Sequence, residues 1–494
     1  MLKRIFAALW ILILFPAFSL EASPATVRKV FKYIDTQYVE PVDIPLIYKK
    51  TLDQMKKNFP AEIKVDPLGP DAMRIVCRKQ TMDFRISNLD QASNVKQMEN
   101  ILQNCVPGDT MSKLRRNHPD NEQIILDMLL GSLDPHSAFM NEETYKELNS
   151  DMQGHFGGIG AEITVQNDVL TVVSPIDDTP AFSAGIKPGD QIIKINDVPT
   201  RGMTSWEAVK KIRGPENTTV RLSIMRKPAT RLKEFNITRA IINIKTVKHK
   251  LYDNHVGYIR LSSFQQNTAS DLKATLRDIA QKSGPLKGLL LDMRNNPGGL
   301  LDQAIKVSDE FLKSGVIVAT RGRTRFYQSR VRARNSGNEP DYPIVILANE
   351  GTASAAEIVT GALQDNRRAL VLGTRTFGKG SVQAIFPLDD GSAIKLTTAK
   401  YYTPNGRVVH EEGITPDVLI GKSQGFREKD LNHFRAADPE DLADLKKKAN
   451  SRNSKDIEVE KEVQLKAGLK LLNQAISAGD LQKGLRAFNT AGIH

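Results

Sequence analysis

Residues 343–366, PIVILANEGTASAAEIVTGALQDN, join an apolar run to an apolar pattern of helical period through a short segment of small residues. This order predicts a buried strand that ends near Asn349 and a helix that begins near Ser354. A unit of the same kind occurs upstream, where KGLLLDMR (287–294) precedes LLDQAIKVSDEFLK (300–313). Strands that alternate with helices predict an α/β domain with a layered sheet, which we place at residues 240–422.

Ser354 stands at the start of this helix, and two interpretations of it stay open from the window alone. Ser354 and Glu357 match the S-x-x-E capping box, in which each side chain accepts a hydrogen bond from the other residue's main-chain N–H. The same position would also place free backbone amides and the helix dipole beside the hydroxyl, where they could stabilise a developing oxyanion. A nucleophilic serine would in addition need a base.

The candidate base is Lys379, in the glycine-flanked segment FGKGSVQ (377–383). A lysine accepts a proton only when it is neutral. Because an ordinary lysine is charged at neutral pH, the role requires burial that lowers the pKa of the amine. Gln383 would orient the amine through an uncharged amide, whereas a carboxylate at that position would favour the ammonium form.

The rest of the chain divides into regions of different pattern. Residues 1–22 carry two cations, a short apolar run and small residues, which predicts a secretory signal peptide and therefore export to the periplasm or cell envelope. Retention of that segment as a membrane tether is the alternative. Residues 24–150 show helical periods, residues 152–228 show short strands with glycine turns that predict a β-rich module, and residues 423–494 form a charged, helix-prone tail.

Composition supports a folded, multidomain protein. The chain has 494 residues, of which 40% are hydrophobic and 26% charged, so it is too long for one core. The formal net charge is +12, which suits an anionic surface such as an envelope or acidic polymers. We favour the alternative that the Lys and Arg residues are dispersed over a solvated surface. With aromatic residues at only 6%, no nucleic-acid partner is expected.

Two further features bear on cofactors and covalent links. Cys77 and Cys105 either form a disulfide in an oxidising compartment or stay separate as buried thiols. No cofactor or metal is expected. The segment GTRTFGKG (373–380) lacks the final Ser or Thr of a phosphate loop, and the pair His410-Glu411 lacks the second histidine of a zinc site.

Several motifs together resemble one family, the carboxyl-terminal processing peptidases, also called tail-specific proteases. The segments that carry the resemblance lie between about residues 125 and 420: residues 346–383, LLLDMRNNPGGLL (289–301), LDPHSAFMNEETY (133–145), FGGIGAEI (156–163) and AFSAGIKPGDQIIKIND (181–197). The resemblance implies a PDZ-like domain and a layered α/β peptidase domain of crotonase or ClpP type.

By this resemblance Ser354 is the nucleophile, Lys379 the general base and later the general acid, and Gln383 the residue that positions the lysine. Many members carry S-A-S-A-S-E where this chain has T-A-S-A-A-E, so Ser354 is the one serine left as candidate. The resemblance assigns the oxyanion hole to the amides of Ala355 and Gly299, with Gly298 as the close alternative.

The resemblance also assigns Gly158, Ile159 and Gly160 to a loop that binds the C-terminal carboxylate of a substrate. The function that follows is a secreted serine endopeptidase that recognises apolar protein C-termini and cuts at or near that end. A non-catalytic PDZ scaffold or apolar-ligand carrier is the alternative, and an acyl-transfer enzyme on a related fold is disfavoured by the export signal. An envelope adaptor protein and a homo-oligomer stay open as partners.

Overall fold

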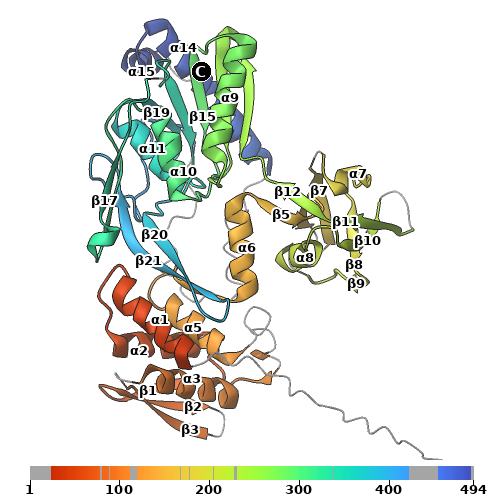
Figure 1. Ribbon diagram of the computed structural model, residues 1–494, viewed down its shortest axis with the longest axis vertical. Coiled ribbons are helices and arrows are strands. Elements are labelled where there is room, and N and C mark those ends of the chain that lie inside the picture. The colour runs from red at the N-terminus through yellow and green to blue at the C-terminus, as the bar shows by residue number, and fades with distance from the viewer. Residues whose placement is uncertain are drawn as a thin grey trace, which may run out of the picture.

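A computed structural model describes residues 24–421, apart from 78–79, 88–89, 109, 112–119, 167–168, 177, 204, 227–230 and 338, together with residues 454–490. The expected signal peptide, residues 1–22, lies outside the described residues. Figure 1 shows an α/β body at the top, a smaller module to the side and an N-terminal region below. Within the described part of the chain, no helix is both long and apolar enough to cross a bilayer.

The α/β body is built on a six-stranded sheet in the order β13-β14-β15-β18-β19-β22. All neighbours pair in parallel except β13 and β14. Strands β15, β18 and β19 are buried along their whole length, as expected where helices cover both faces. The strands span Val247–Tyr252, Val256–Leu261, Gly288–Asp292, Ile344–Ala348, Ala369–Gly373 and Val418–Leu419.

Helices α9 (Thr268–Ser283), α10 (Leu301–Asp309) and α11 (Ala355–Asp365) pack on one face of this sheet. The opposite face is covered by α14 (Ser454–Ala478), which in turn packs on α15 (Leu481–Thr490). The close approach needs Gly468, because a Cβ there would come within 2.9 Å of the Leu347 side chain. The layered α/β fold and the helical C-terminal segment are therefore confirmed.

A second, antiparallel sheet of order β17-β16-β21-β20 adjoins the body and reaches into the N-terminal region. The far ends of β20 and β21 pack in the N-terminal core through Leu388, Ile394 and Leu396. Strand β4 from the N-terminal region pairs with β21. The five strands span Ser329–Arg332, Val316–Gly322, Ala393–Tyr402, Ser381–Pro387 and Ala138–Met140.

The N-terminal region contains the expected helices and also a sheet that was not expected. The helices are α1 (Pro24–Gln37), α2 (Ile44–Asn58), α3 (Gln91–Cys105) and α5 (Asn121–Gly131). Between α2 and α3 an antiparallel sheet is formed by β1 (Lys64–Gly69), β2 (Ala72–Cys77) and β3 (Gln80–Arg85). In β2 the buried residues Met73, Ile75 and Cys77 alternate with more exposed ones, the period of two expected of a strand. The neighbouring strands β1 and β3 each bury a single residue, so they show no such alternation.

Cys77 and Cys105 form a disulfide that joins the end of β2 to the end of α3. The two open alternatives are thereby resolved in favour of the linked pair. The bond closes a loop with a sequence separation of 28 residues. We expect Cys77→Ala/Cys105→Ala to lower the free energy of unfolding of this region by about 3 kcal/mol, because the unfolded chain regains the freedom that the loop removes. Urea unfolding measures this, and an unchanged midpoint would contradict it.

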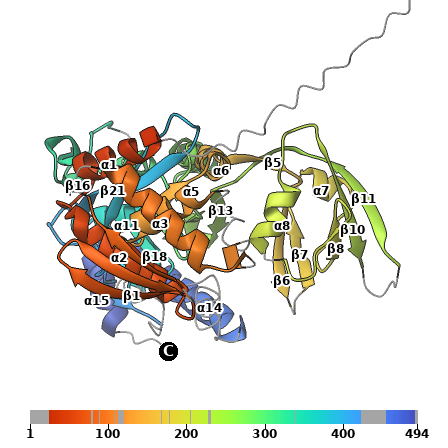
Figure 2. The ribbon, with the colours of Figure 1, turned by 90° about the horizontal axis from the view of Figure 1, so that it is seen from below.

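The β-rich module is a five-stranded path of order β11-β10-β8-β7-β6, with β9 paired to β8. Figure 2 shows it to one side of the molecule, linked through α6 (Glu142–Gln153) and the paired strands β5 (His155–Gly158) and β12 (Ala240–Asn243). Its strands, β6 to β11, span Ala161–Gln166, Val169–Pro175, Gln191–Ile195, Val198–Pro199, Thr219–Met225 and Lys233–Thr238, and its helices are α7 (Pro180–Ser183) and α8 (Ser205–Ile212).

Candidate active site

Ser354 precedes α11 with a backbone conformation that is rare for a serine. Its φ is 54° and its ψ is −118°. An ordinary N-cap residue lies in the β region, and a positive φ outside glycine costs about 1–3 kcal/mol unless the surroundings enforce it. Ser354 is half-buried at the junction between β18 and α11. The backbone strain therefore lies at the residue that the sequence identifies as the candidate nucleophile.

Glu357 does more than complete a capping box. Its fully buried carboxylate accepts the Ser354 N–H at 2.8 Å, as the box predicts. It also accepts the Gly378 N–H at 2.8 Å, the Lys379 N–H at 2.9 Å and the Thr376 hydroxyl at 2.5 Å. One buried carboxylate therefore fixes both the start of α11 and the loop that carries Lys379.

Lys379 and Gln383 lie on the segment that leads into β20. Lys379 is half-buried. The Gln383 side-chain amide donates to the Ser381 hydroxyl at 2.9 Å and lies 3.4 Å from the Thr397 hydroxyl. The glutamine is thus held beside Ser381, two residues after Lys379, and its positioning of the amine stays a prediction.

The turn NNPGG, residues 295–299, packs directly against Ser354. A Cβ on Gly298 would come within 2.7 Å of the Ser354 Cβ and 2.9 Å of the Ala355 nitrogen. Gly298 and Gly299 have φ values of 100° and 141°, which favour glycine. The Gly298 N–H donates to the Asn296 side chain at 2.9 Å, whereas no described residue accepts from the N–H of Gly299 or of Ala355.

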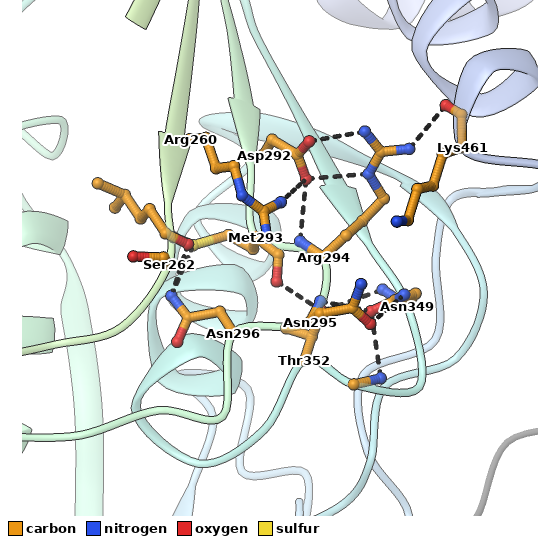
Figure 3. A network of polar contacts seen from close by, with 12 residues as sticks. Arg260, Ser262, Asp292, Met293, Arg294, Asn295, Asn296, Asn349, Thr352 and Lys461 are labelled. Carbon is orange, nitrogen blue, oxygen red and sulfur yellow. Dashed lines mark hydrogen bonds and ion pairs between the residues drawn. The ribbon is translucent and has the colours of Figure 1, made fainter. Parts of the chain in front are cut away.

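A polar network holds this turn in place, as Figure 3 shows. Arg294 pairs with the buried Asp292 at 2.6 Å and donates to the Lys461 carbonyl of α14 at 2.8 Å. Burial opposes the charge of Asp292, but the hydrogen bonds from Arg294 hold the pKa of that carboxyl below its usual value. The Asn295 N–H and the Asn349 side chain bond at 2.8 Å, which joins the turn to the loop before Ser354.

The β-rich module carries a pocket beside the expected carboxylate loop. The pocket has a volume of about 90 Å³ and lies between the loop, β6 and α8. Gly158, Ile159 and Gly160 line it together with apolar side chains that include Ile163 and Val209. A Cβ on Gly160 would come within 2.4 Å of Thr179, which explains a glycine at that position.

Comparison with known proteins places these features in one family. A model described as "Peptidase family S41" matches residues 255–420, and a PDZ domain model matches residues 148–225. The chain is 46% identical over 321 residues to the carboxy-terminal-processing protease of Bartonella bacilliformis, across 63% of this chain and 74% of that protein. The chain belongs to peptidase family S41. It is a carboxy-terminal-processing serine protease with a PDZ domain.

Two further proteins are similar to this chain. A "Probable CtpA-like serine protease" of Staphylococcus haemolyticus is 40% identical over 292 residues, which are 59% of this chain and 58% of that protein. A solved structure described as the photosystem II D1 C-terminal processing protease matches with 23% identity and a TM-score of 0.44, over 80% of this chain and 92% of that chain.

Three residues were missed from the sequence, two in the S41 peptidase site and one in the PDZ pocket. The Tyr401 hydroxyl lies 3.1 Å from the Ser354 carbonyl and also contacts the Lys379 carbonyl, and Thr376 binds Glu357. In the PDZ pocket, the Arg213 guanidinium lies over the Phe156 ring at 4.2 Å. Tyr401 is 47 residues from Ser354, so no local pattern could reveal it. Among the described residues no cluster of three potential metal ligands occurs.

Glu357 of the S41 site makes the stability of the protein depend on pH. Burial raises the pKa of its carboxyl from 4.5 to about 7, although four hydrogen bonds to its oxygens oppose the shift. The folded state therefore holds this proton more tightly than the unfolded state. The stabilisation is complete below pH 4.5 and is lost as the pH rises through about 7.

We expect Glu357→Gln to remove this pH dependence and to lower kcat at least about tenfold, because the amide NH₂ would face main-chain donors that now bind a carboxylate. Denaturant unfolding at pH 5 and pH 8 measures the first effect, and peptide turnover the second. Glu350→Gln, which alters a neighbouring carboxylate bonded to Thr374, is the matched control. Equal pH dependence in Glu357→Gln and the wild type would refute the assignment.

Proposed function

We propose that this peptidase is an exported endopeptidase in which Ser354 and Lys379 form a catalytic dyad. Ser354 Oγ attacks the scissile carbonyl while neutral Lys379 Nζ takes its proton, and the same proton is returned to the leaving amine. Water then hydrolyses the acyl-enzyme, with Lys379 again acting as base. Gln383 positions the amine, and the reaction needs no cofactor.

The observation that carries the proposal is the shared anchor of the two residues. Glu357 accepts the main-chain N–H of both Ser354 and Lys379, at 2.8 and 2.9 Å. A serine that only caps a helix needs neither a positive φ nor a link to a distant lysine. The same carboxylate therefore supports a fixed distance between the hydroxyl and the segment that carries the base.

The amides of Ala355 and Gly299 are proposed to bind the oxyanion. Both N–H groups lack an acceptor among the described residues, and Ala355 adds the positive end of the α11 dipole. Gly298 lies nearer to Ser354, but its N–H is already engaged by Asn296. Donors fixed in this way stabilise developing charge without reorganisation, an effect worth about 3–4 kcal/mol per donor.

The PDZ pocket is proposed to select substrates with an apolar C-terminal residue. The amides around Gly158, Ile159 and Gly160 would bind the terminal carboxylate, while Ile163 and Val209 would contact the last side chain. Arg213 also lines the pocket, where its charge favours a carboxylate. Because Arg213 pairs with Asp151 at 3.1 Å, the arginine is held in place before a substrate arrives.

One experiment separates this function from that of a non-catalytic PDZ scaffold. The full chain and its Ser354→Ala variant are incubated with an unfolded protein that ends in apolar residues, and fragments are followed by mass spectrometry. A peptidase with this dyad produces fragments only in the wild type, and both chains bind the substrate. Binding without fragments in both chains would favour the scaffold.

The pocket makes a separate prediction. We expect Val209→Asp to raise KM for such a substrate about tenfold, because it places a charged carboxylate against the apolar last side chain of the substrate. The value of kcat should change little, and a short ester without a recognised tail should be turned over as before. Val198→Asp, on β9 outside the pocket, is the matched control. An equal KM for the two variants would rule out the pocket as the tail-binding site.

Export of the protein is proposed from residues 1–22 alone. The cationic start, the short apolar run and the small residues after it are those of a secretory signal. An envelope adaptor and a homo-oligomer are compatible with this location and are tested by purification of the protein from the envelope followed by mass determination.

A further inference from the structure

Six arginines lie within residues 316–334, a segment that contains no acidic residue. This segment, which we call the arginine hairpin, consists of β16, the short helix η2 (Arg325–Tyr327) and β17. Its arginines are Arg321, Arg323, Arg325, Arg330, Arg332 and Arg334. The expectation that the basic residues are dispersed is therefore wrong for this part of the chain.

The hairpin directs its cations away from the protein core. In β17 and just beyond it, Val331 and Ala333 pack against the core of the α/β body, whereas Arg330, Arg332 and Arg334 are exposed. This alternation places the three arginines on the outer face, because successive side chains of a strand point to opposite faces. Strand β17 is the edge of its sheet, as Figure 1 shows at the left of the molecule.

A hollow of about 440 Å³ lies on the same sheet. It is lined by Arg321, Arg330 and Gln328, together with Tyr402 of β21. The Arg321 guanidinium lies over the Tyr402 ring, 4.6 Å from its centre. Because the neighbouring Tyr401 points to Ser354, the hollow lies on the face of β21 opposite to the catalytic residues.

The cations of the hairpin are not neutralised by carboxylates of the described residues. Arg323 donates to the carbonyl oxygen of Asp35, and the other five arginines form no ion pair with a carboxylate of the described residues. The Asp309 carboxylate accepts a hydrogen bond from the main-chain N–H of Arg334 at 2.7 Å, so this contact involves the backbone of the hairpin. Five exposed guanidinium groups are thus available to an external anion.

Phe326 stands at the tip of the hairpin with 85% of its surface exposed, the largest value for a big apolar side chain among the described residues. Its position is fixed by a contact with the neighbouring Tyr327. Phe326 packs edge-on against Tyr327, whose hydroxyl donates to Gln37 of α1 at 2.9 Å. Apart from this contact, the ring stands in water beside Arg325 and contributes little to the packing of the described residues.

We propose that the arginine hairpin binds the anionic headgroups of a phospholipid surface, with Phe326 entering the interface. Guanidinium groups match phosphate oxygens in geometry and charge, and aromatic side chains favour the boundary between headgroups and acyl chains. An acidic peptide added to β17 is the less suitable partner, since repeated charges on an edge strand oppose the pairing of another strand. When the peptidase is bound in this way, its catalytic residues lie on the side that faces away from the outer face of the hairpin.

Vesicle binding by the full chain tests the proposal. Partition is measured by flotation with vesicles of phosphatidylglycerol and phosphatidylethanolamine, and with vesicles of phosphatidylcholine alone. Residues 1–22, with their two cations and apolar run, are common to all variants. The quantity compared between variants is therefore the ratio of the two partition coefficients. The test variant is Arg330→Gln/Arg332→Gln/Arg334→Gln. The control with equal charge loss is Lys56→Gln/Lys248→Gln/Arg277→Gln, in which each residue is exposed on a different element.

We expect the test variant to lower the ratio about 100-fold, at about fivefold for each arginine, while the control stays near the wild type. Phe326→Ala should lower binding to anionic vesicles about tenfold. Turnover of a short ester by all variants shows that the fold is intact. Equal ratios for the test and control variants, or equal binding of the wild type to both vesicles, would overturn the proposal. Arginine-dependent binding of a polyglutamate peptide without vesicle binding would overturn it in favour of an acidic protein partner.

Discussion

Ser354→Ala is expected to lower kcat for a peptide substrate by about four to six orders of magnitude, the loss seen when the nucleophile of a serine peptidase is removed. The substitution deletes one hydroxyl at a half-buried position, and the hydrogen bonds of Glu357 to the main chain remain available. The fold should therefore be retained. Circular dichroism and a thermal unfolding scan check this, and steady-state turnover measures the loss.

A matched control tests whether turnover requires a serine at position 354 or merely a serine in this segment. Ala356 lies two positions after Ser354, and its side chain is fully buried in α11. We expect Ser354→Ala/Ala356→Ser to stay inactive and Ala356→Ser alone to stay active, because the new hydroxyl cannot reach the site. Turnover by Ser354→Ala at more than about a hundredth of the wild-type rate would exclude Ser354 as the nucleophile.

Lys379→Ala is expected to lower kcat by up to about four orders of magnitude, because a positioned base contributes about 10²–10⁴ to the rate and acts together with the nucleophile. Lys379→Arg provides the sharper test. A guanidinium keeps the positive charge but is not deprotonated in proteins, so it cannot act as a base. If Lys379 serves as the base, the arginine variant is as inactive as the alanine variant.

The losses of kcat caused by the two substitutions should not be additive. In Ser354→Ala/Lys379→Ala the rate should equal that of Ser354→Ala, since neither residue accelerates the reaction without the other. A lysine that acts only as a fixed cation would give a different pattern. Substantial activity in Lys379→Arg, or additive losses in the double variant, would show that the amine does not take the proton.

The parts that could be predicted from the sequence are those encoded by neighbouring residues. The strand, turn and helix around Ser354 follow from an apolar run, small residues and a helical period within residues 343–366. The glycines of the NNPGG turn and of the PDZ loop mark positions where a Cβ would collide with another segment. Local patterns of this kind can be recognised in the sequence because the backbone has few alternative conformations at these positions.

The remainder depends on contacts between distant segments. Tyr401 reaches Ser354 only because β21 passes beside the start of α11, and Arg294 reaches the Lys461 carbonyl across 167 positions of sequence. The capping-box pattern was correct for the bond from Ser354 to Glu357, but it did not reveal the bonds from the Lys379 loop to the same carboxylate. The sheet β1-β2-β3 was missed because only β2 shows the alternation of a strand, whereas β1 and β3 each bury a single residue.

The proposed mechanism requires Ser354 to form an acyl-enzyme with Lys379 as its base. The most direct measurement is to quench the enzyme in acid during turnover of a peptide ester and to map the acyl group by mass spectrometry. We expect one acyl group, on the peptide that contains Ser354, and none in Lys379→Ala quenched at the same time. An acyl group on another side chain, or one formed equally fast in Lys379→Ala, would contradict it.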